Sequence, residues 1–135
     1  MSEAPAFKKK IIGMSKKAAA IEFLTLAASG EVAEAYARYI AADFKHHNAH
    51  FAHDRQSLLD AMAQSAAAEP NKSFEIIQAF EESDTVAVHS RLTRVSANAQ
   101  YAVVHILKFS DGKIAEMWDI AQEVPADSPN ELGMF

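Results

Sequence analysis

Two apolar runs separated by Ser110-Asp111-Gly112 constrain the fold of this chain more than any other stretch. They lie between Tyr101 and Gln122, and Val, Ile, Leu, Phe and Trp dominate them. Branched and aromatic residues favour strands, and an Asp-Gly pair between two such runs is a strong hairpin signal. We therefore expect an antiparallel strand pair whose turn contains Asp111 and Gly112.

Each of these runs carries one polar residue between two apolar neighbours. His105 interrupts the first run and Asp119 interrupts the second. A buried polar side chain costs free energy unless it finds a partner, so these two positions are the first candidates for chemistry.

The turn type decides whether His105 and Asp119 share a face of the hairpin. A two-residue loop at Asp111-Gly112 would place them on opposite faces. A type I turn with Gly112 as a left-handed bulge would pair Phe109 with Lys113, and Asp119 would then lie diagonally beside His105. We favour this bulged register because glycine adopts a positive φ without steric cost.

Composition indicates a single globular domain and excludes several classes of protein. The chain has 135 residues, of which 50% are hydrophobic and 23% are charged. A net charge of −5 without a basic stripe argues against a nucleic-acid partner, and the lack of cysteine excludes disulfides and thiolate chemistry. No apolar run is long enough to span a membrane. An amphipathic first helix, rather than a signal peptide, favours a cytoplasmic protein.

Helical periodicity comes first along the chain and strand periodicity follows. After a flexible leader over residues 1–14, we expect helices over 16–28, 32–40 and 55–67, with Ser15 and Asp54 as N-caps. Strands over 74–80 and 85–94 then precede the hairpin. Four strands in meander order predict an antiparallel sheet, and this order of elements predicts an α+β architecture within one domain, residues 15–135.

The hairpin also carries a family motif. Residues 109–119 read F-x-D-G-K-I-x-E-x-W-D, and together with Phe74-Glu75-Ile76 and the DTVAVHSR segment at 84–91 they resemble the SnoaL-like polyketide cyclase family of the NTF2-like superfamily. The resemblance covers about residues 18–135. It implies an NTF2-like α+β cone, in which a curved antiparallel sheet wraps the N-terminal helices around a pocket. It also implies homodimers that form through the sheet.

The resemblance gives His105 and Asp119 specific roles. Polyketide cyclases of this family close a ring by an intramolecular aldol reaction without a cofactor. They use an aspartate as general base and a histidine beside the substrate carbonyl, fourteen residues apart across a hairpin, and His105 and Asp119 match both the types and the spacing. Asp119 would remove the proton and His105 would stabilise the oxygen as it gains charge. Neither a cofactor nor a metal is expected.

Three functions remain open on the sequence. The leading hypothesis is a cofactor-free enzyme that removes a proton next to the carbonyl of a small, largely apolar compound, as in aldol-type cyclisation. A second hypothesis is a non-catalytic module of the same fold that binds a small ligand or serves dimerisation. A third is a double-bond isomerase or hydratase that uses the same acid–base pair. The expected partners are a small molecule and a second copy of the chain.

Two further groups of polar residues have more than one interpretation. A histidine-rich segment with His46, His47, His50 and His53 could bind a metal, form a solvated loop, or place His47 or Asn48 against a ligand. The alternating polar residues of strand 85–94 could face solvent, a dimer interface or the pocket, and Arg91 could clamp a carboxylate if it turned inward. The substrate-binding candidates are His47, Asn48, Tyr36, Met117, Trp118 and Arg91.

Overall fold

The computed structural model describes residues 14–135, so the expected leader lies outside the described residues except for Met14. The helices are α2 (Lys16–Ala28), α3 (Val32–Tyr39) and α4 (Arg55–Ala68), and a short 3-10 turn, η1, covers Val95–Ala97. The strands are β1 (Ile40–His47), β2 (Ser73–Glu82), β3 (Thr85–Arg94), β4 (Ala99–Ser110) and β5 (Lys113–Glu123). None of the described helices is long and apolar enough to cross a membrane.

Short polar side chains cap the two longer helices and determine where they begin. The Ser15 hydroxyl accepts a hydrogen bond from the backbone N–H of Ala18 at 3.0 Å, and the Asp54 carboxylate accepts one from the N–H of Ser57 at 2.9 Å. Each cap satisfies a donor that the first helical turn leaves without a partner. Both expected helix starts are therefore confirmed.

The described strands form one sheet with the order β1-β5-β4-β3-β2. β2 to β5 pair as the expected antiparallel meander. The prediction of an all-antiparallel sheet was wrong, because residues 40–47 form a further strand that pairs in parallel with β5. Along β1, the side chains of Phe44 and His46 are buried while Lys45 and His47 are exposed. This alternation is typical of a strand with one face on the core.

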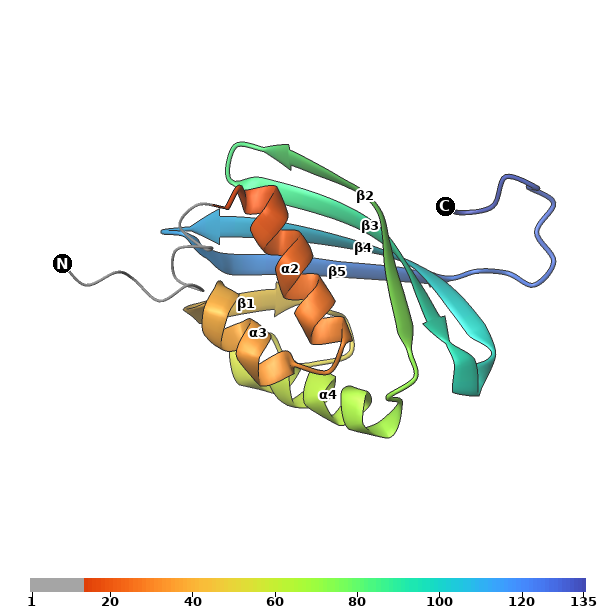
Figure 1. The fold of residues 1–135 in the computed structure, drawn as a ribbon, viewed down its shortest axis with the longest axis horizontal. Coiled ribbons are helices and arrows are strands. Elements are labelled where there is room, and N and C mark those ends of the chain that lie inside the picture. The colour runs from red at the N-terminus through yellow and green to blue at the C-terminus, as the bar shows by residue number, and fades with distance from the viewer. Residues whose placement is uncertain (1–13) are drawn as a thin grey trace.

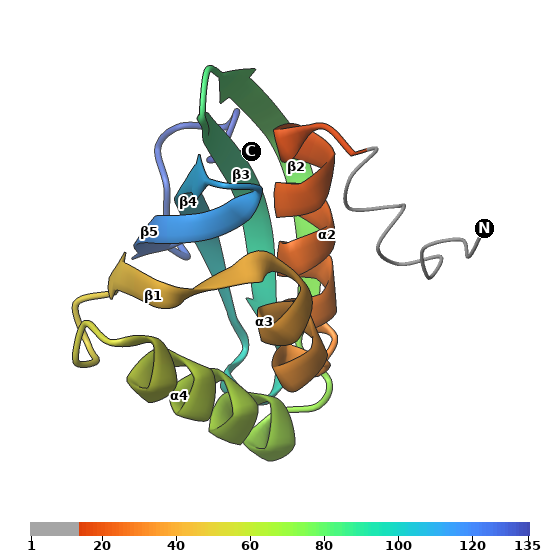
Figure 2. The same cartoon turned by 90° about the vertical axis from the view of Figure 1, so that its left-hand side faces the viewer.

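The helices cover one face of the curved sheet, which we call the inner face (Figures 1 and 2). α2 crosses this face, and α4 lies beside β1 at one end of it. The buried core joins helix residues such as Phe23 and Tyr36, whose rings lie 5.8 Å apart, to sheet residues such as Val88 and Leu107. The predicted α+β cone, with the helices packed in a curved sheet, is confirmed.

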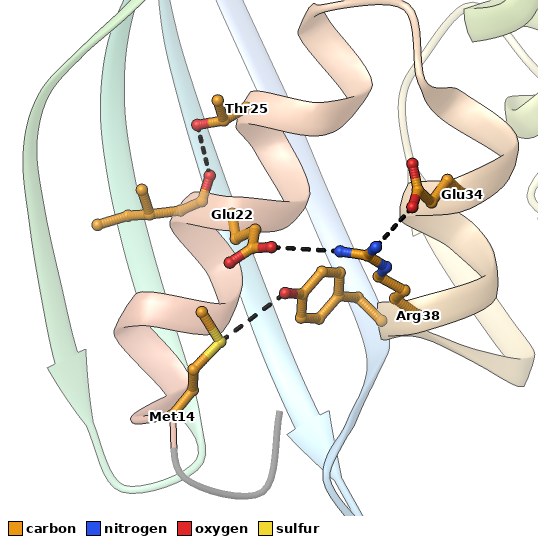
Figure 3. A network of polar contacts seen from close by, with 7 residues as sticks. Met14, Glu22, Thr25, Glu34 and Arg38 are labelled. Carbon is orange, nitrogen blue, oxygen red and sulfur yellow. Dashed lines mark hydrogen bonds and ion pairs between the residues drawn. The ribbon is translucent and has the colours of Figure 1, made fainter. Parts of the chain in front are cut away.

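A polar network connects α2 to α3 (Figure 3). Arg38 on α3 lies 3.5 Å from the Glu22 carboxylate on α2 and also pairs with Glu34 one helical turn away. The Tyr39 hydroxyl reaches the sulfur of Met14 just before α2. Partly exposed ion pairs contribute little to stability, so this network orients the two helices more than it stabilises them.

The segment after β5 returns to the sheet face opposite α2, which we call the outer face (Figure 2). The His89 ring stacks on Phe135 with centroids 5.8 Å apart, and its Nε2 lies 3.0 Å from the backbone carbonyl of Met134. The guanidinium of Arg91 lies 4.3 Å from the centre of the Phe135 ring. These contacts cover part of the outer face of β3 with the C-terminal residues.

Candidate active site

A cavity of about 470 Å³ lies between the inner face of the sheet and helices α2 and α4. This volume is within the range of small-molecule sites in proteins. Most of its wall is apolar, with side chains from α2, α4 and four strands: Phe23, Leu24, Leu58, Met62, Phe74, Leu92, Val103 and Met117. His105, Asp119 and Asn48 are among the polar residues that line it.

His105 and Asp119 face each other across β4 and β5. They are direct cross-strand partners, and His105 Nε2 lies 3.5 Å from Asp119 Oδ1. This separation is longer than a good hydrogen bond, so the two groups are neighbours that a substrate oxygen could separate. Their side chains are only 12% and 20% exposed, respectively. Both side chains line the same cavity.

The turn that leads to this pair differs from the predicted one. Asp111 and Gly112 have φ values of 51° and 77°, and Ser110 pairs with Lys113. Two positive φ values in a two-residue loop are typical of a type I′ turn, whose twist matches that of the flanking strands. The predicted register, with Gly112 as the bulge and Phe109 opposite Lys113, was therefore wrong.

A β-bulge further along β5 corrects the register. Phe109 pairs with Ile114 and Lys108 pairs with Glu116, so Ala115 between them has no cross-strand partner. An extra residue reverses the inward and outward alternation of every later side chain. Without this bulge the tight turn would place Asp119 on the outer face. Asp119 therefore faces the cavity because Ala115 is left out of the pairing.

Asn48, just after β1, holds one oxygen of the Asp119 carboxylate. Its side-chain N–H donates to Asp119 Oδ2 at 2.8 Å, while its own Oδ1 accepts from the backbone N–H of His50 at 3.0 Å. Its backbone N–H donates to His46 Nδ1 at 3.1 Å, which anchors the loop to β1. Asn48 therefore fixes the orientation of the carboxylate, and Oδ1 is the oxygen nearer to His105.

Burial determines the protonation of the groups around this pair. Loss of hydration lowers the pKa of His105, and the nearby Asp119 charge only partly opposes this effect. His105 is consequently a neutral imidazole at neutral pH. Its Nδ1 is buried and makes no hydrogen bond within the described residues. Burial likewise raises the pKa of Tyr36, whose hydroxyl lies 3.4 Å from Met62 Sδ, so Tyr36 remains a phenol.

The other predicted site residues divide between the cavity and the outer face. Met117 lines the cavity, as Asn48 does, and Tyr36 is buried in the core beside it. His47 and Trp118 stack on each other with ring centres 4.7 Å apart, and His47 Nε2 lies 2.6 Å from the Glu116 carboxylate. Together with Arg91 they lie on the outer face. None of these three residues is among those that line this cavity, because strand alternation turns their side chains to the other face.

Comparison with known families identifies the fold. Residues 20–117 match the family model described as the SnoaL-like domain. The chain belongs to this family. The predicted resemblance is confirmed. No curated protein sequence matches it significantly.

Solved structures of the same fold come from several bacteria. AclR, a proposed hydroxylase from Streptomyces galilaeus, has a TM-score of 0.68 and 19% identity, over 79% of this chain and 88% of its own. IdmH, a proposed polyketide cyclase from Streptomyces antibioticus, has a TM-score of 0.66 and 18% identity, over 81% and 93%. An NTF2-like protein of unknown function from Cytophaga hutchinsonii has a TM-score of 0.66 and 11% identity, over 81% and 91%. These similarities establish the NTF2-like fold.

The histidine-rich segment of this SnoaL-like domain is divided by the end of β1. His46 points inward and its Nε2 lies 2.7 Å from the carbonyl of Ala52, while His50 and Phe51 line the cavity. Across residues 14–135, no three His, Asp or Glu side chains come together in a group that could hold a metal ion. The segment thus contributes Asn48, His50 and Phe51 to the cavity wall, which agrees with the interpretation that Asn48 lies against a ligand.

Sequence reasoning missed a cationic group on the cavity wall. Lys72, Arg94 and Tyr101 all line the cavity. Arg94 falls within the strand predicted over 85–94, and Lys72 falls between the predicted helix 55–67 and the predicted strand 74–80; the sequence assigns neither a role. Alternation along β3 could have indicated Arg94, because it lies two residues after the inward-facing Leu92. No pattern in the sequence indicates Lys72, since its position depends on how α4 packs.

Proposed function

We propose that this SnoaL-like domain is an enzyme that removes a proton next to a carbonyl group, with Asp119 as the base and His105 as the donor to the oxygen. The observation that carries the proposal is the pair itself, with Asp119 Oδ1 and His105 Nε2 3.5 Å apart in one largely apolar cavity. Enolisation needs these two functions together, a base for the proton and a donor for the developing charge.

The carboxylate is oriented for proton transfer. Asn48 holds Oδ2, which leaves Oδ1 directed toward His105. In the proposed step the C–H electron pair moves to the carbonyl as an enolate forms, and Oδ1 takes the proton.

His105 would act as a neutral hydrogen-bond donor. With Nε2 facing the Asp119 carboxylate, the tautomer with hydrogen on Nε2 is favoured, and this hydrogen can turn to a substrate oxygen that enters between them. Because burial lowers the pKa of His105, the imidazole stabilises the enolate without first carrying a charge. A donor fixed in a dry cavity is more effective than one in water.

The enolate can continue in two ways. Attack on a second carbonyl of the same molecule closes a ring by aldol addition, and return of the proton to another carbon gives an isomer. Both reactions share the first step, so a test of proton removal does not require the natural substrate. The mostly apolar wall favours a small compound with a hydrocarbon body.

The test is exchange of hydrogen for deuterium next to a carbonyl. The protein is incubated in heavy water with a panel of enolisable ketones and esters, and mass spectrometry measures the deuterium gained. We expect exchange above the rate in buffer, and a loss of about 10²–10⁴-fold in Asp119→Asn, because the amide has the shape of the carboxylate but cannot take the proton.

The control is Asp127→Asn, which changes an exposed carboxylate in the C-terminal segment and should leave exchange unchanged. Equal exchange by Asp119→Asn and the parent would contradict the role of the base. Binding of the compounds with no exchange in any of them would favour the non-catalytic module instead.

We also propose that the protein forms a homodimer through the outer face of the sheet. Strand pairing places Val104 beside Ile120 and Ile106 beside Trp118 on this face, and Ile120 is 57% exposed. An apolar strip of this kind is typical of interaction surfaces. Light scattering should give twice the mass of the chain, and Ile120→Asp should reduce it. Leu132→Asp, at a tail residue that is 86% exposed, is the control. A monomeric parent would refute the dimer.

A further inference from the structure

The cavity carries opposite charges in two separate places. The Asp119 carboxylate lies beside His105, its partner across the strands. The cations Lys72 and Arg94 line the same cavity, together with Tyr101. Tyr101 is four residues from His105 along β4, which corresponds to about 13 Å of strand. A ligand that fills the cavity therefore meets a carboxylate near one end and cations near the other.

Arg94 already has its own counter-ion. Its Nε donates to Glu69 Oε2 at 3.0 Å and its Nη2 donates to Oε1 of the same carboxylate. The Ser96 hydroxyl also donates to Glu69 at 3.1 Å, so this carboxylate is held in place by three hydrogen bonds. The hydrogen bonds that Arg94 donates to Glu69, followed by the contact with Tyr101, raise the pKa of Arg94. Glu69 therefore neutralises Arg94.

Within residues 14–135, no carboxylate forms an ion pair with Lys72. Its Nζ donates to the Ser65 hydroxyl, which carries no charge. Burial lowers the pKa of Lys72; the Glu69 charge opposes this, and the Arg94 charge adds to it. Among the described residues, two cations thus share one carboxylate at this end of the cavity, and one positive charge is left without a counter-ion. An ammonium group that has lost part of its water and lacks a counter-ion gains from an anionic ligand.

We propose that Lys72 binds a carboxylate of the substrate, so that the substrate is a carbonyl compound with an acid group at the end remote from its enolisable carbon. The carbonyl half of this assignment rests on the proposed function; the acid half rests on Lys72. One uncompensated positive charge matches a monoanion, whereas a phosphate monoester carries close to two negative charges. Glu69 also excludes a second anion from Arg94.

The test uses ligands that cannot react. Calorimetry measures the binding of straight-chain monocarboxylates of increasing length and of the primary amides of the same lengths, which differ in charge but scarcely in shape. The parent should prefer the acid by about tenfold to a hundredfold, the range expected for a charge-assisted hydrogen bond. Alkyl phosphates of the same lengths form a third arm, and they should bind more weakly than the acids.

Variants assign the preference to one residue. Lys72→Met should abolish the preference for the acid, Lys72→Arg should retain it, and Lys17→Met, at an exposed position of α2, should leave it unchanged. A thermal melt checks that each variant folds, and Lys72→Gln replaces the methionine variant if that one is unfolded.

Several outcomes would overturn the proposal. They are equal binding of acid and amide by the parent, a preference for the acid that survives in the folded variant with an uncharged residue at position 72, or tighter binding of the phosphate. These outcomes are separate from a failure of the proposed function, which shows as deuterium exchange that does not respond to Asp119→Asn. If the protein prefers acids but catalyses no deuterium exchange, the acid-binding site at Lys72 is supported and the proposed enzymatic function is contradicted.

Discussion

Acid should destabilise this protein through His105. Burial holds the pKa of His105 below its ordinary value, and Asp119 only partly opposes this. In the unfolded chain the same imidazole has a pKa of about 6.5. As the pH falls below this value, the unfolded chain takes up a proton that the folded protein does not. The contribution of neutral His105 to stability is therefore complete above the pKa that this histidine has in the unfolded chain. It is lost as the pH falls toward the lower pKa that His105 has in the folded protein.

The size of the effect follows from the one additional proton that the unfolded chain binds at this histidine. The free energy of unfolding should fall by at most about 1.4 kcal/mol per pH unit in this window. Between about pH 7.5 and about pH 5.5 the loss from His105 should approach 1.4 kcal/mol, because only the lower half of the interval lies below the ordinary histidine pKa. For a domain of this size it corresponds to a fall of about 3–6 °C in melting temperature.

Urea unfolding of the parent and of His105→Gln at both pH values isolates this contribution. The other histidines, His46 among them, are present in both proteins, so their contributions cancel in the difference. The parent should lose more stability than the variant on acidification. Asp119→Asn removes the negative charge that partly opposes the lowering of the His105 pKa. The free energy of unfolding of this variant should therefore keep falling to a lower pH than that of the parent. Equal pH dependence of the parent and His105→Gln would refute the reasoning.

Three smaller predictions concern the fold and are read by thermal melts. Ser15→Ala removes the hydroxyl that caps α2 and should cost about 1 kcal/mol; no change would mean that water replaces the cap. Gly112→Ala should cost about 1–2 kcal/mol from its positive φ alone, since no atom lies within 4 Å of the added carbon. Phe135→Ala should cost about 0.5–1 kcal/mol by removing the ring beneath Arg91; Leu132→Ala should cost nothing, and equal losses would contradict this assignment.

The fold could be predicted wherever the chain carries local signals. Caps at Ser15 and Asp54, and a change of period at residue 73, identify the helices and the meander. β1 was not predicted as a strand because its outward residues, such as Lys45 and His47, give the segment the composition of a loop. Its pairing with β5 is parallel and joins residues about 70 positions apart, so no hairpin signal accompanies it.

Only part of the candidate site could be predicted from the sequence. Polar residues inside apolar runs indicated His105 and Asp119, and the resemblance supplied roles for them. The turn was misjudged because aspartate, as well as glycine, can adopt a positive φ, which permits the tight loop at Asp111. Lys72 owes its place to tertiary packing beside α4, so its neighbours in the chain could not indicate that it lines the cavity.

The bulge at Ala115 determines how this hairpin tolerates changes in length. Removing Ala115 would leave Phe109 opposite Ile114 and Lys108 opposite Glu116, so every later pair would keep its partner and its face. One residue removed between Glu116 and Asp119 would instead turn the carboxylate out of the cavity. The same change in length is harmless or destructive according to which side of Glu116 it falls.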